Sequence, residues 1–102
     1  MSKTKSKLEI ETENELCRRA RKAKCLCIKM QTKNDRNWPD RLIIKQNREC
    51  FMVEVKRLGL QPRPAQHAKH KELRAMCQHI YVIDCPEQIS DVFASEDLDA
   101  TI

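Results

Sequence analysis

The sequence has one glycine and four prolines among 102 residues, and these low counts exclude collagen-like, linker-like and low-complexity chains. It also lacks any apolar run close to the roughly 20 residues that a membrane-spanning helix needs. The first residues, MSKTKSKLEIETE, contain lysines but no apolar stretch behind them, so we expect no secretory signal. These absences predict a soluble protein of the cytoplasm that folds as a single domain.

Six cysteines are present, but none of them has the Cys-x-x-Cys spacing of a structural zinc site. Cys25 and Cys27 alternate around one residue of an expected strand, so their side chains face the same way. We expect all six thiols to act as small buried hydrophobes in a reducing cytosol. An exposed thiol or an intermolecular disulfide is the alternative for Cys17 or Cys77.

Charge is spread unevenly along the chain, whose formal net charge is +5. Residues 1–36 hold eleven basic and five acidic side chains, and residues 37–83 hold nine and four. Residues 84–102 hold six acidic side chains and no lysine or arginine. The body of the domain is therefore strongly basic, which suits a polyanionic partner such as nucleic acid. Solvated lysines and arginines on helix faces commonly give the same balance.

The spacing of apolar and polar residues predicts a small mixed sheet flanked by helices, in the order α-β-β-β-α-β-α. A tight polar turn near Gln46 and Asn47 predicts a hairpin between the second and third strands. Residues 1–94 are expected to form the domain, and the acidic residues 95–102 a disordered tail. The expected elements are a helix over 8–24, strands over 25–30, 39–45 and 49–56, a helix over 65–78, a strand over 79–84 and a short helix over 86–94.

Three polar residues stand out on the expected hairpin. Asp40 lies at the start of the second strand, and Glu54 and Lys56 leave the same face of the third strand because they are two residues apart. Two carboxylates from neighbouring strands can converge on a hard divalent cation, and a lysine beside them can orient water or stabilise charge on a phosphate. By residue type and spacing alone, an ordinary ion pair on a solvated strand face is the better interpretation of Glu54 and Lys56.

The order of these residues resembles the PD-(D/E)xK nuclease superfamily, and the stretch from Ile28 to Val92 resembles its VRR-NUC family of virus-type replication and repair nucleases. These occur as small standalone phage proteins and as domains of larger repair nucleases. The resemblance implies a restriction-endonuclease-like α-β-β-β-α-β core. The matching positions are Pro39-Asp40-Arg41, Glu54-Val55-Lys56, Pro64-Ala65-Gln66, His70, Leu73 and the strand IYVID over 80–84.

The family also uses a glutamate of its first helix as a metal ligand, and four glutamates are candidates here. Glu13 lies three residues before Leu16 and seven before Ala20, on the helix face that meets the core. Glu9 shares that face one turn earlier and is the second choice. The remaining glutamates fit a solvated acidic run near a helix N-terminus.

The resemblance implies a Mg²⁺ or Mn²⁺ site formed by Glu13, Asp40, Glu54 and the Val55 carbonyl, with Lys56 positioning the attacking water. Gln66 is expected to reach the site from the second helix. The residues expected to contact DNA are Arg41, Arg57, Arg63 and His70, although Arg41 is equally suited to pair with the acidic cluster and His70 to support the site or the core.

The expected activity is that of a structure-selective endonuclease in DNA repair, which cuts branched DNA such as a Holliday junction or a flap and leaves 5′-phosphate ends. We expect a homodimer in a bacterial or phage-infected cell, with no nucleotide cofactor. A non-catalytic DNA-binding module with the same fold is the alternative. The sequence departs from the family where Asn37 and Trp38 replace a Gly-Val before the PD pair, and where Lys24 replaces a glycine after the first helix.

Overall fold

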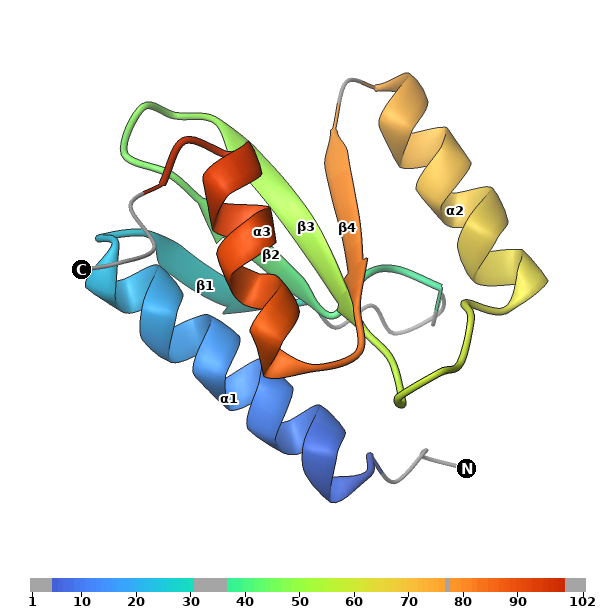
Figure 1. Cartoon of the computed structure of the whole chain (residues 1–102). Helices are drawn as coiled ribbons and strands as arrows, with labels where there is room; N and C mark the ends of the chain where they lie inside the picture. The colour runs from blue at the N-terminus through green and yellow to red at the C-terminus, as the bar shows by residue number, and fades with distance from the viewer. Residues whose placement is uncertain (1–4, 31–36, 77, 99–102) are drawn as a thin grey trace.

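The chain folds into a four-stranded mixed sheet with helices on both of its faces (Figure 1). This computed structural model describes residues 5–30, 37–76 and 78–98. The predicted α/β class and the order of the elements are confirmed. None of the described helices is long and apolar enough to cross a membrane. The elements are α1 (Lys7–Lys22), β1 (Leu26–Lys29), β2 (Arg41–Ile44), β3 (Cys50–Val55), α2 (Pro64–Ala75), β4 (His79–Ile83), the 3-10 helix η1 (Pro86–Gln88) and α3 (Ile89–Ser95).

Local chemistry sets both ends of α1. The Ser6 hydroxyl accepts a hydrogen bond from the Glu9 amide at 3.2 Å, and the Glu9 carboxylate accepts one from the Ser6 amide at 2.9 Å. This capping box satisfies two amides that the helix itself leaves unpaired, so α1 begins one residue before the predicted start. After the helix, Lys24 has a φ of 63°, a left-handed conformation that glycine adopts more readily. The lysine thus holds a backbone conformation that favours glycine.

β3 is an inner strand of the sheet, whose order is β1-β2-β3-β4. The pairs β1–β2 and β2–β3 are antiparallel, and the predicted hairpin between β2 and β3 is confirmed. β4 pairs with β3 in parallel, and α2 provides the crossover that such a pair requires. Residues on β3 therefore have a strand on either side.

The two faces of the sheet carry separate apolar cores. On one face, Leu16 and Ala20 of α1 and Phe93 of α3 pack against the strands. On the other face, Leu73 of α2 packs with Met52 and Ile80, and Trp38 joins this smaller cluster with the Lys69 ammonium 4.9 Å from its ring. Each strand thus alternates its side chains between an α1/α3 face and an α2 face.

The α2 face of β1 is largely uncovered. Leu26 is 63% exposed and Ile28 is 41% exposed, which is unusual for two aliphatic residues on the same strand. Ile28 pairs with Leu42, which belongs to the α2-side cluster, so all three side chains lie on the same side of the sheet. α2 covers β3 and β4 on this side, and it leaves apolar surface on β1 open to solvent.

The disordered tail predicted from residue 95 does not start there. Residue 95 is the last residue of α3, Glu96 is buried, and Leu98 packs against the main core. The pKa of Glu96 is held below its usual value because hydrogen bonds from its polar partners outweigh the effect of burial. Residues 99–102 lie outside the described part of the chain. The side chains that contact Glu96 are Lys45, His79 and Tyr81.

Candidate active site

Asp40 joins the start of β2 to the end of β3. Its Oδ2 atom accepts a hydrogen bond of 2.7 Å from the Val55 amide. Arg41 pairs with Val53 in the antiparallel ladder, so the next position outward places Asp40 opposite Glu54. The fixed strand register therefore brings together the two carboxylates that the sequence places fourteen residues apart.

Glu54 is a carboxylate buried on the inner strand β3, with 3% of the residue exposed. Its Oε2 atom accepts a hydrogen bond of 3.1 Å from Gln66, whereas its Oε1 atom has no hydrogen-bond partner. Burial, and then the negative charge of Asp40, raise the pKa of Glu54 to about 8, although the charges of Lys56 and Lys5 oppose this. A carboxyl group in such surroundings needs a cation or a proton to compensate its charge.

Gln66 connects the glutamate and the lysine of the E-x-K tripeptide. Its amide nitrogen donates to Glu54, and its Oε1 atom accepts from the Lys56 ammonium at 3.1 Å and from the Arg63 amide at 3.0 Å. Gln66 lies in the first turn of α2 and is 4% exposed. The first turn of α2 thus places Gln66 in hydrogen-bond contact with both Glu54 and Lys56.

Glu13 reaches the same region from the buried face of α1, where helix phase places it. Its carboxylate accepts hydrogen bonds of 2.6 Å from Arg41 Nε and 2.6 Å from Lys5 Nζ. Burial by itself raises the pKa of Glu13, but these two hydrogen bonds outweigh burial and hold the pKa below its usual value. Glu9 instead completes the capping box of the helix. Of the two roles considered for Arg41, the structure shows pairing with the acidic cluster.

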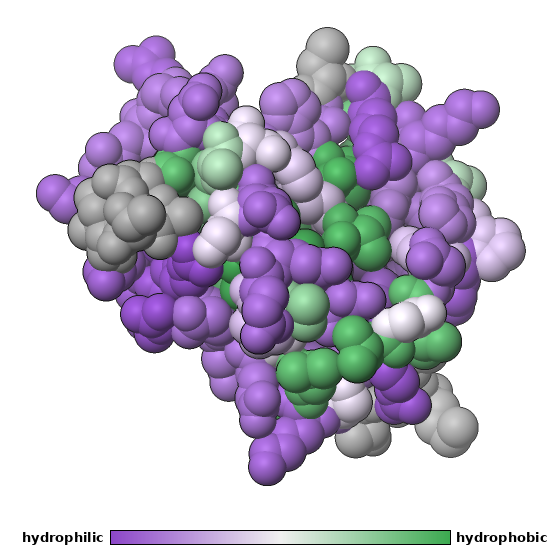
Figure 2. Space-filling view, in the orientation of Figure 1, coloured by the Kyte–Doolittle hydropathy of each residue, from purple (hydrophilic) through white to green (hydrophobic). Residues whose placement is uncertain are grey.

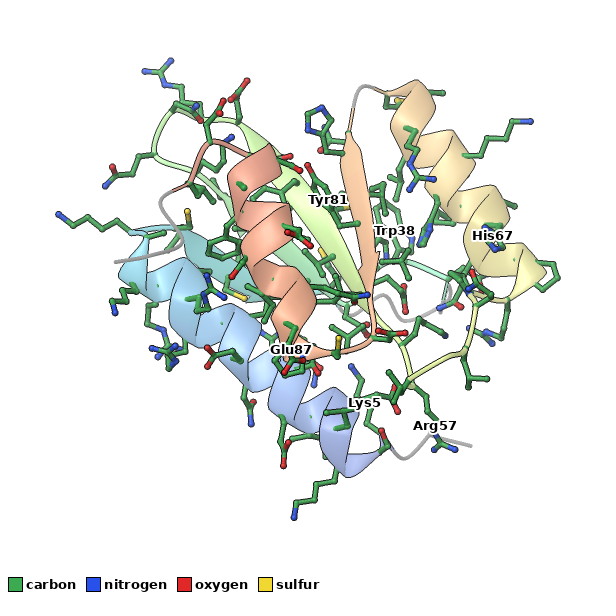
Figure 3. The ribbon with its side chains drawn as sticks, in the orientation of Figure 1. Lys5, Trp38, Arg57, His67, Tyr81 and Glu87 are labelled. Carbon is green, nitrogen blue, oxygen red and sulfur yellow. The ribbon has the colours of Figure 1, made fainter. Side chains whose placement is uncertain are left out.

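Lys5 is a residue of the site that the sequence did not predict. Its ammonium group lies 2.6 Å from Glu13 Oε1 and 3.1 Å from Asp40 Oδ1, and so bridges two carboxylates from different elements. Figure 3 shows Lys5 beside the start of α1, near the ends of β3 and β4. The spacing of Ser6 and Glu9 is that of a capping box, which marks the start of a helix. This signal could have shown that Lys5, directly before Ser6, lies at an ordered helix start.

The four residues expected to contact DNA occupy different environments. Arg57 and Arg63 are exposed on the loop between β3 and α2, immediately after Lys56. His70 is 1% exposed, and its Nε2 atom lies 3.7 Å from Glu54 Oε1. The imidazole therefore faces the site and not the solvent, which favours the alternative in which His70 supports the site over a contact with DNA.

The donor set fits a hard divalent cation in its chemistry, since Glu13, Asp40 and Glu54 all offer carboxylate oxygens and one of them, Glu54 Oε1, is buried without a partner. Within the described ranges, however, no three acidic, histidine or cysteine side chains converge closely enough to hold an ion. The Lys5 ammonium group carries a positive charge between two of these carboxylates, because it lies within ion-pair distance of both Glu13 and Asp40.

Comparison with solved structures identifies the fold. A solved structure titled "VRR_NUC domain" superposes with a TM-score of 0.82 at 21% sequence identity, over 87% of this chain and 97% of that chain. No family model matches the sequence, and no curated protein matches it either. The chain therefore has the fold of a VRR_NUC domain, which confirms the predicted likeness at the level of three-dimensional structure.

Proposed function

We propose that this chain is a metal-dependent DNA endonuclease of the VRR-NUC family. The observation that carries the proposal is the convergence of Asp40, Glu54 and Lys56 at the end of β3, with Gln66 hydrogen-bonded to both members of the E-x-K tripeptide. An ion pair that only stabilised the fold would not require a buried glutamate with one carboxylate oxygen, Glu54 Oε1, left without a hydrogen-bond partner. The nuclease fold of the superposed domain supports the same assignment.

Glu13, Asp40, Glu54 and the Val55 carbonyl are the groups that would hold Mg²⁺ or Mn²⁺. Such an ion, when bound, polarises the scissile phosphate and favours deprotonation of the attacking water. Lys56 carries the positive charge that orients the water and stabilises negative charge on the phosphate. Gln66 acts as a positioning residue, since its carbonyl oxygen holds the Lys56 ammonium at 3.1 Å.

The loop between β3 and α2 is the proposed contact surface for the DNA backbone. It carries the exposed Arg57 and Arg63, and between them Leu58 and Leu60 are 62% and 54% exposed. Figure 2 shows hydrophobic surface gathered at the lower right of an otherwise largely hydrophilic face, where this loop lies. The arginines suit phosphates, and the leucines suit the apolar faces of sugars or unstacked bases.

We further propose that the enzyme is a homodimer that cuts branched DNA, either a four-way junction or a flap. The open apolar surface of Leu26 and Ile28 on the edge strand β1 supports a second copy of the chain as the partner. Two sites related by a two-fold axis can address opposed strands of a junction. The expected setting is DNA repair in the cytoplasm of a bacterial or phage-infected cell.

The test uses purified full-length protein with Mg²⁺ or Mn²⁺ on a four-way junction, a flap, a single strand and a plain duplex of matched sequence. We expect cleavage of the branched substrates, its loss in EDTA, and products that DNA ligase can rejoin because they carry 5′-phosphates and 3′-hydroxyls. The Lys56→Ala variant serves as the inactive control. Binding of all substrates without cleavage in either metal would contradict the enzyme and support the non-catalytic module.

A further inference from the structure

Two cysteines from different elements touch each other beside the candidate active site. Cys17 lies on the buried face of α1 and Cys27 on β1, and their Sγ atoms are 2.8 Å apart. This separation exceeds the bonded distance of about 2.05 Å in a disulfide by only about 0.8 Å. Both residues are free thiols in this state.

The fold, and not chance proximity in sequence, creates this contact. Cys27 pairs with Ile43, a residue of the α1/α3 core, so its side chain points toward α1. Cys17 stands one helical turn after Glu13 and on the same face of α1. A change in the link between the two sulfurs would therefore act directly on the segment of α1 that presents the Glu13 carboxylate.

The other described thiols have different surroundings. The Cys25 thiol donates to the Ala23 carbonyl at 3.8 Å, and the Cys50 thiol donates to the Gln78 side chain at 3.3 Å. Cys85 lies at the start of η1. Within the described chain, the contact of two thiols is thus a property of Cys17 and Cys27, and the remaining cysteines provide internal controls.

We propose that Cys17 and Cys27 are a redox pair, which a hydroperoxide converts to an intramolecular disulfide. In the first step the Cys17 sulfur attacks one oxygen of hydrogen peroxide and the O–O bond breaks. The attacked oxygen stays on Cys17 as a sulfenic acid, and the other leaves as water with the Cys17 thiol proton. In the second step the Cys27 sulfur attacks the Cys17 sulfur, and the hydroxyl group departs with the Cys27 proton as a second water. Two electrons pass from the thiols to the peroxide.

The surroundings of the pair assign the order of these steps. Burial, together with the neighbouring Cys17 sulfur, raises the pKa of Cys27 to about 12. Because the thiolate is the reactive form, this raised pKa disfavours Cys27 as the attacking nucleophile, and its contact with Cys17 places it to act as the resolving thiol. Cys27, already in contact, then resolves the sulfenic acid before it can be oxidised further.

The disulfide would tie α1 to the edge strand β1 next to the Arg41–Glu13 pair. Both sulfurs lie close enough to Arg41 to act on its pKa, so the redox pair and the acidic cluster share this arginine as a neighbour. Oxidation therefore holds the Glu13 segment of α1 against the sheet without consuming any proposed metal ligand.

The experiment treats the reduced full chain with hydrogen peroxide and measures its intact mass, its free thiols and the linked peptides. We expect the loss of two hydrogens and of two thiols per chain, a Cys17–Cys27 linked peptide, and a rise in unfolding temperature of about 4 °C or more over the reduced protein. In Cys27→Ala, a sulfenic-acid probe should label Cys17. Cys50→Ala should behave like the unsubstituted chain.

Several results would overturn the proposal: a disulfide that joins other cysteines or two chains, oxidation of Cys17 to a sulfinic acid with Cys27 intact, or equal thiol loss in Cys17→Ala. The linked-peptide map of the unsubstituted protein decides the question even where a variant fails to fold. None of these readouts depends on nuclease activity, so the proposal can fail or succeed apart from the proposed function.

Discussion

The Nε2 atom of His70 lies 3.7 Å from the Oε1 atom of Glu54, and both atoms are buried without a hydrogen-bond partner. Burial, and then the positive charges of Arg74, His67 and Lys56, lower the pKa of His70, which favours the neutral imidazole. Burial raises the pKa of Glu54 to about 8. At neutral pH, the metal-free site thus holds an uncharged histidine beside a carboxyl group that retains its proton.

The first prediction concerns the pH dependence of stability. The folded-state pKa of Glu54 is about 8, against 4.5 for an ordinary glutamate, so the folded protein binds the proton more tightly than the unfolded chain. The contribution of Glu54 to the free energy of unfolding is therefore fully present below pH 4.5. It falls by at most about 1.4 kcal/mol per pH unit as the pH rises toward 8. Glu54→Gln removes this loss. Denaturant unfolding in EDTA should therefore show a smaller drop from pH 6 to pH 9 in Glu54→Gln, whereas Glu72→Gln on exposed α2 should match the unsubstituted chain.

The second prediction concerns the E-x-K tripeptide. Lys56→Ala and Glu54→Ala should each lower the rate of cleavage by about 100-fold or more, because Lys56 carries the positive charge that stabilises the phosphate and Glu54 is a proposed ligand of the metal ion. Binding of a branched substrate, measured in Ca²⁺ by fluorescence anisotropy, should persist. Lys71→Ala, an exposed lysine of α2, is the matched control. Full cleavage by either site variant would remove the proposed active site.

The third prediction separates the two glutamates of α1. Glu13→Gln should abolish cleavage and weaken Mn²⁺ binding in calorimetry, since it removes a buried carboxylate of the acidic cluster. Glu9→Gln should keep activity and lose at most about 1 kcal/mol of stability through the altered capping box. Normal cleavage by Glu13→Gln together with an inactive Glu9→Gln would show that the functional carboxylate of α1 lies one turn earlier, at Glu9.

The fourth prediction concerns Lys5, whose ammonium must leave Glu13 and Asp40 before an ion can bind between them. Lys5→Ala should therefore raise the affinity for Mn²⁺, by up to about tenfold, which corresponds to about 1.4 kcal/mol. Without metal, the same change should lower the unfolding temperature because two carboxylates lose their cation. Lys7→Ala, exposed at the start of α1, should change neither value.

The fifth prediction concerns the C-terminal residues. The sequence suggests that removal of residues 95–102 leaves cleavage intact, but this truncation deletes the buried Glu96, and the buried Lys45 then keeps only the longer pair with the exposed Glu49, at 3.5 Å, of its two ion pairs within the described residues. The truncation should destabilise the fold by about 3 kcal/mol or more. Removal of residues 99–102 alone should preserve both stability and cleavage. Equal stability of the two truncated chains would show that the Glu96 contacts contribute little.

The parts of the site that follow from local spacing could be predicted from the sequence. The placement of Asp40 and Glu54 on one hairpin needs only strand periodicity and a turn, and Glu13 needs only helix phase. Each of these placements depends on the periodicity of side-chain directions in a strand or a helix, which a few consecutive residues reveal. The order of the helices and strands was predictable for the same reason.

The parts that depend on contacts between distant segments could not be predicted. Lys5 and Glu96 lie in strongly polar segments whose composition suggests disorder, and their partners come from elements far away in sequence. His70 has the helix phase of Gln66 but lies deeper under α2, and only the packing of that helix reveals its burial. Amino-acid composition indicates how strongly a segment prefers solvent, but it does not indicate which side chains contact each other in the fold. Lys5, Glu96 and His70 all lie close to ionisable side chains from other elements.

The parallel pairing of β3 with β4 has a consequence during synthesis on the ribosome. Glu54 is translated well before residues 79–83, yet β3 gains its second neighbouring strand only when these residues have emerged and paired with it. Until then β3 is a sheet edge, and α2, which carries Gln66, has no β4 beneath it. The topology therefore delays assembly of the candidate active site until residues 79–83 have left the exit tunnel and β4 has paired with β3.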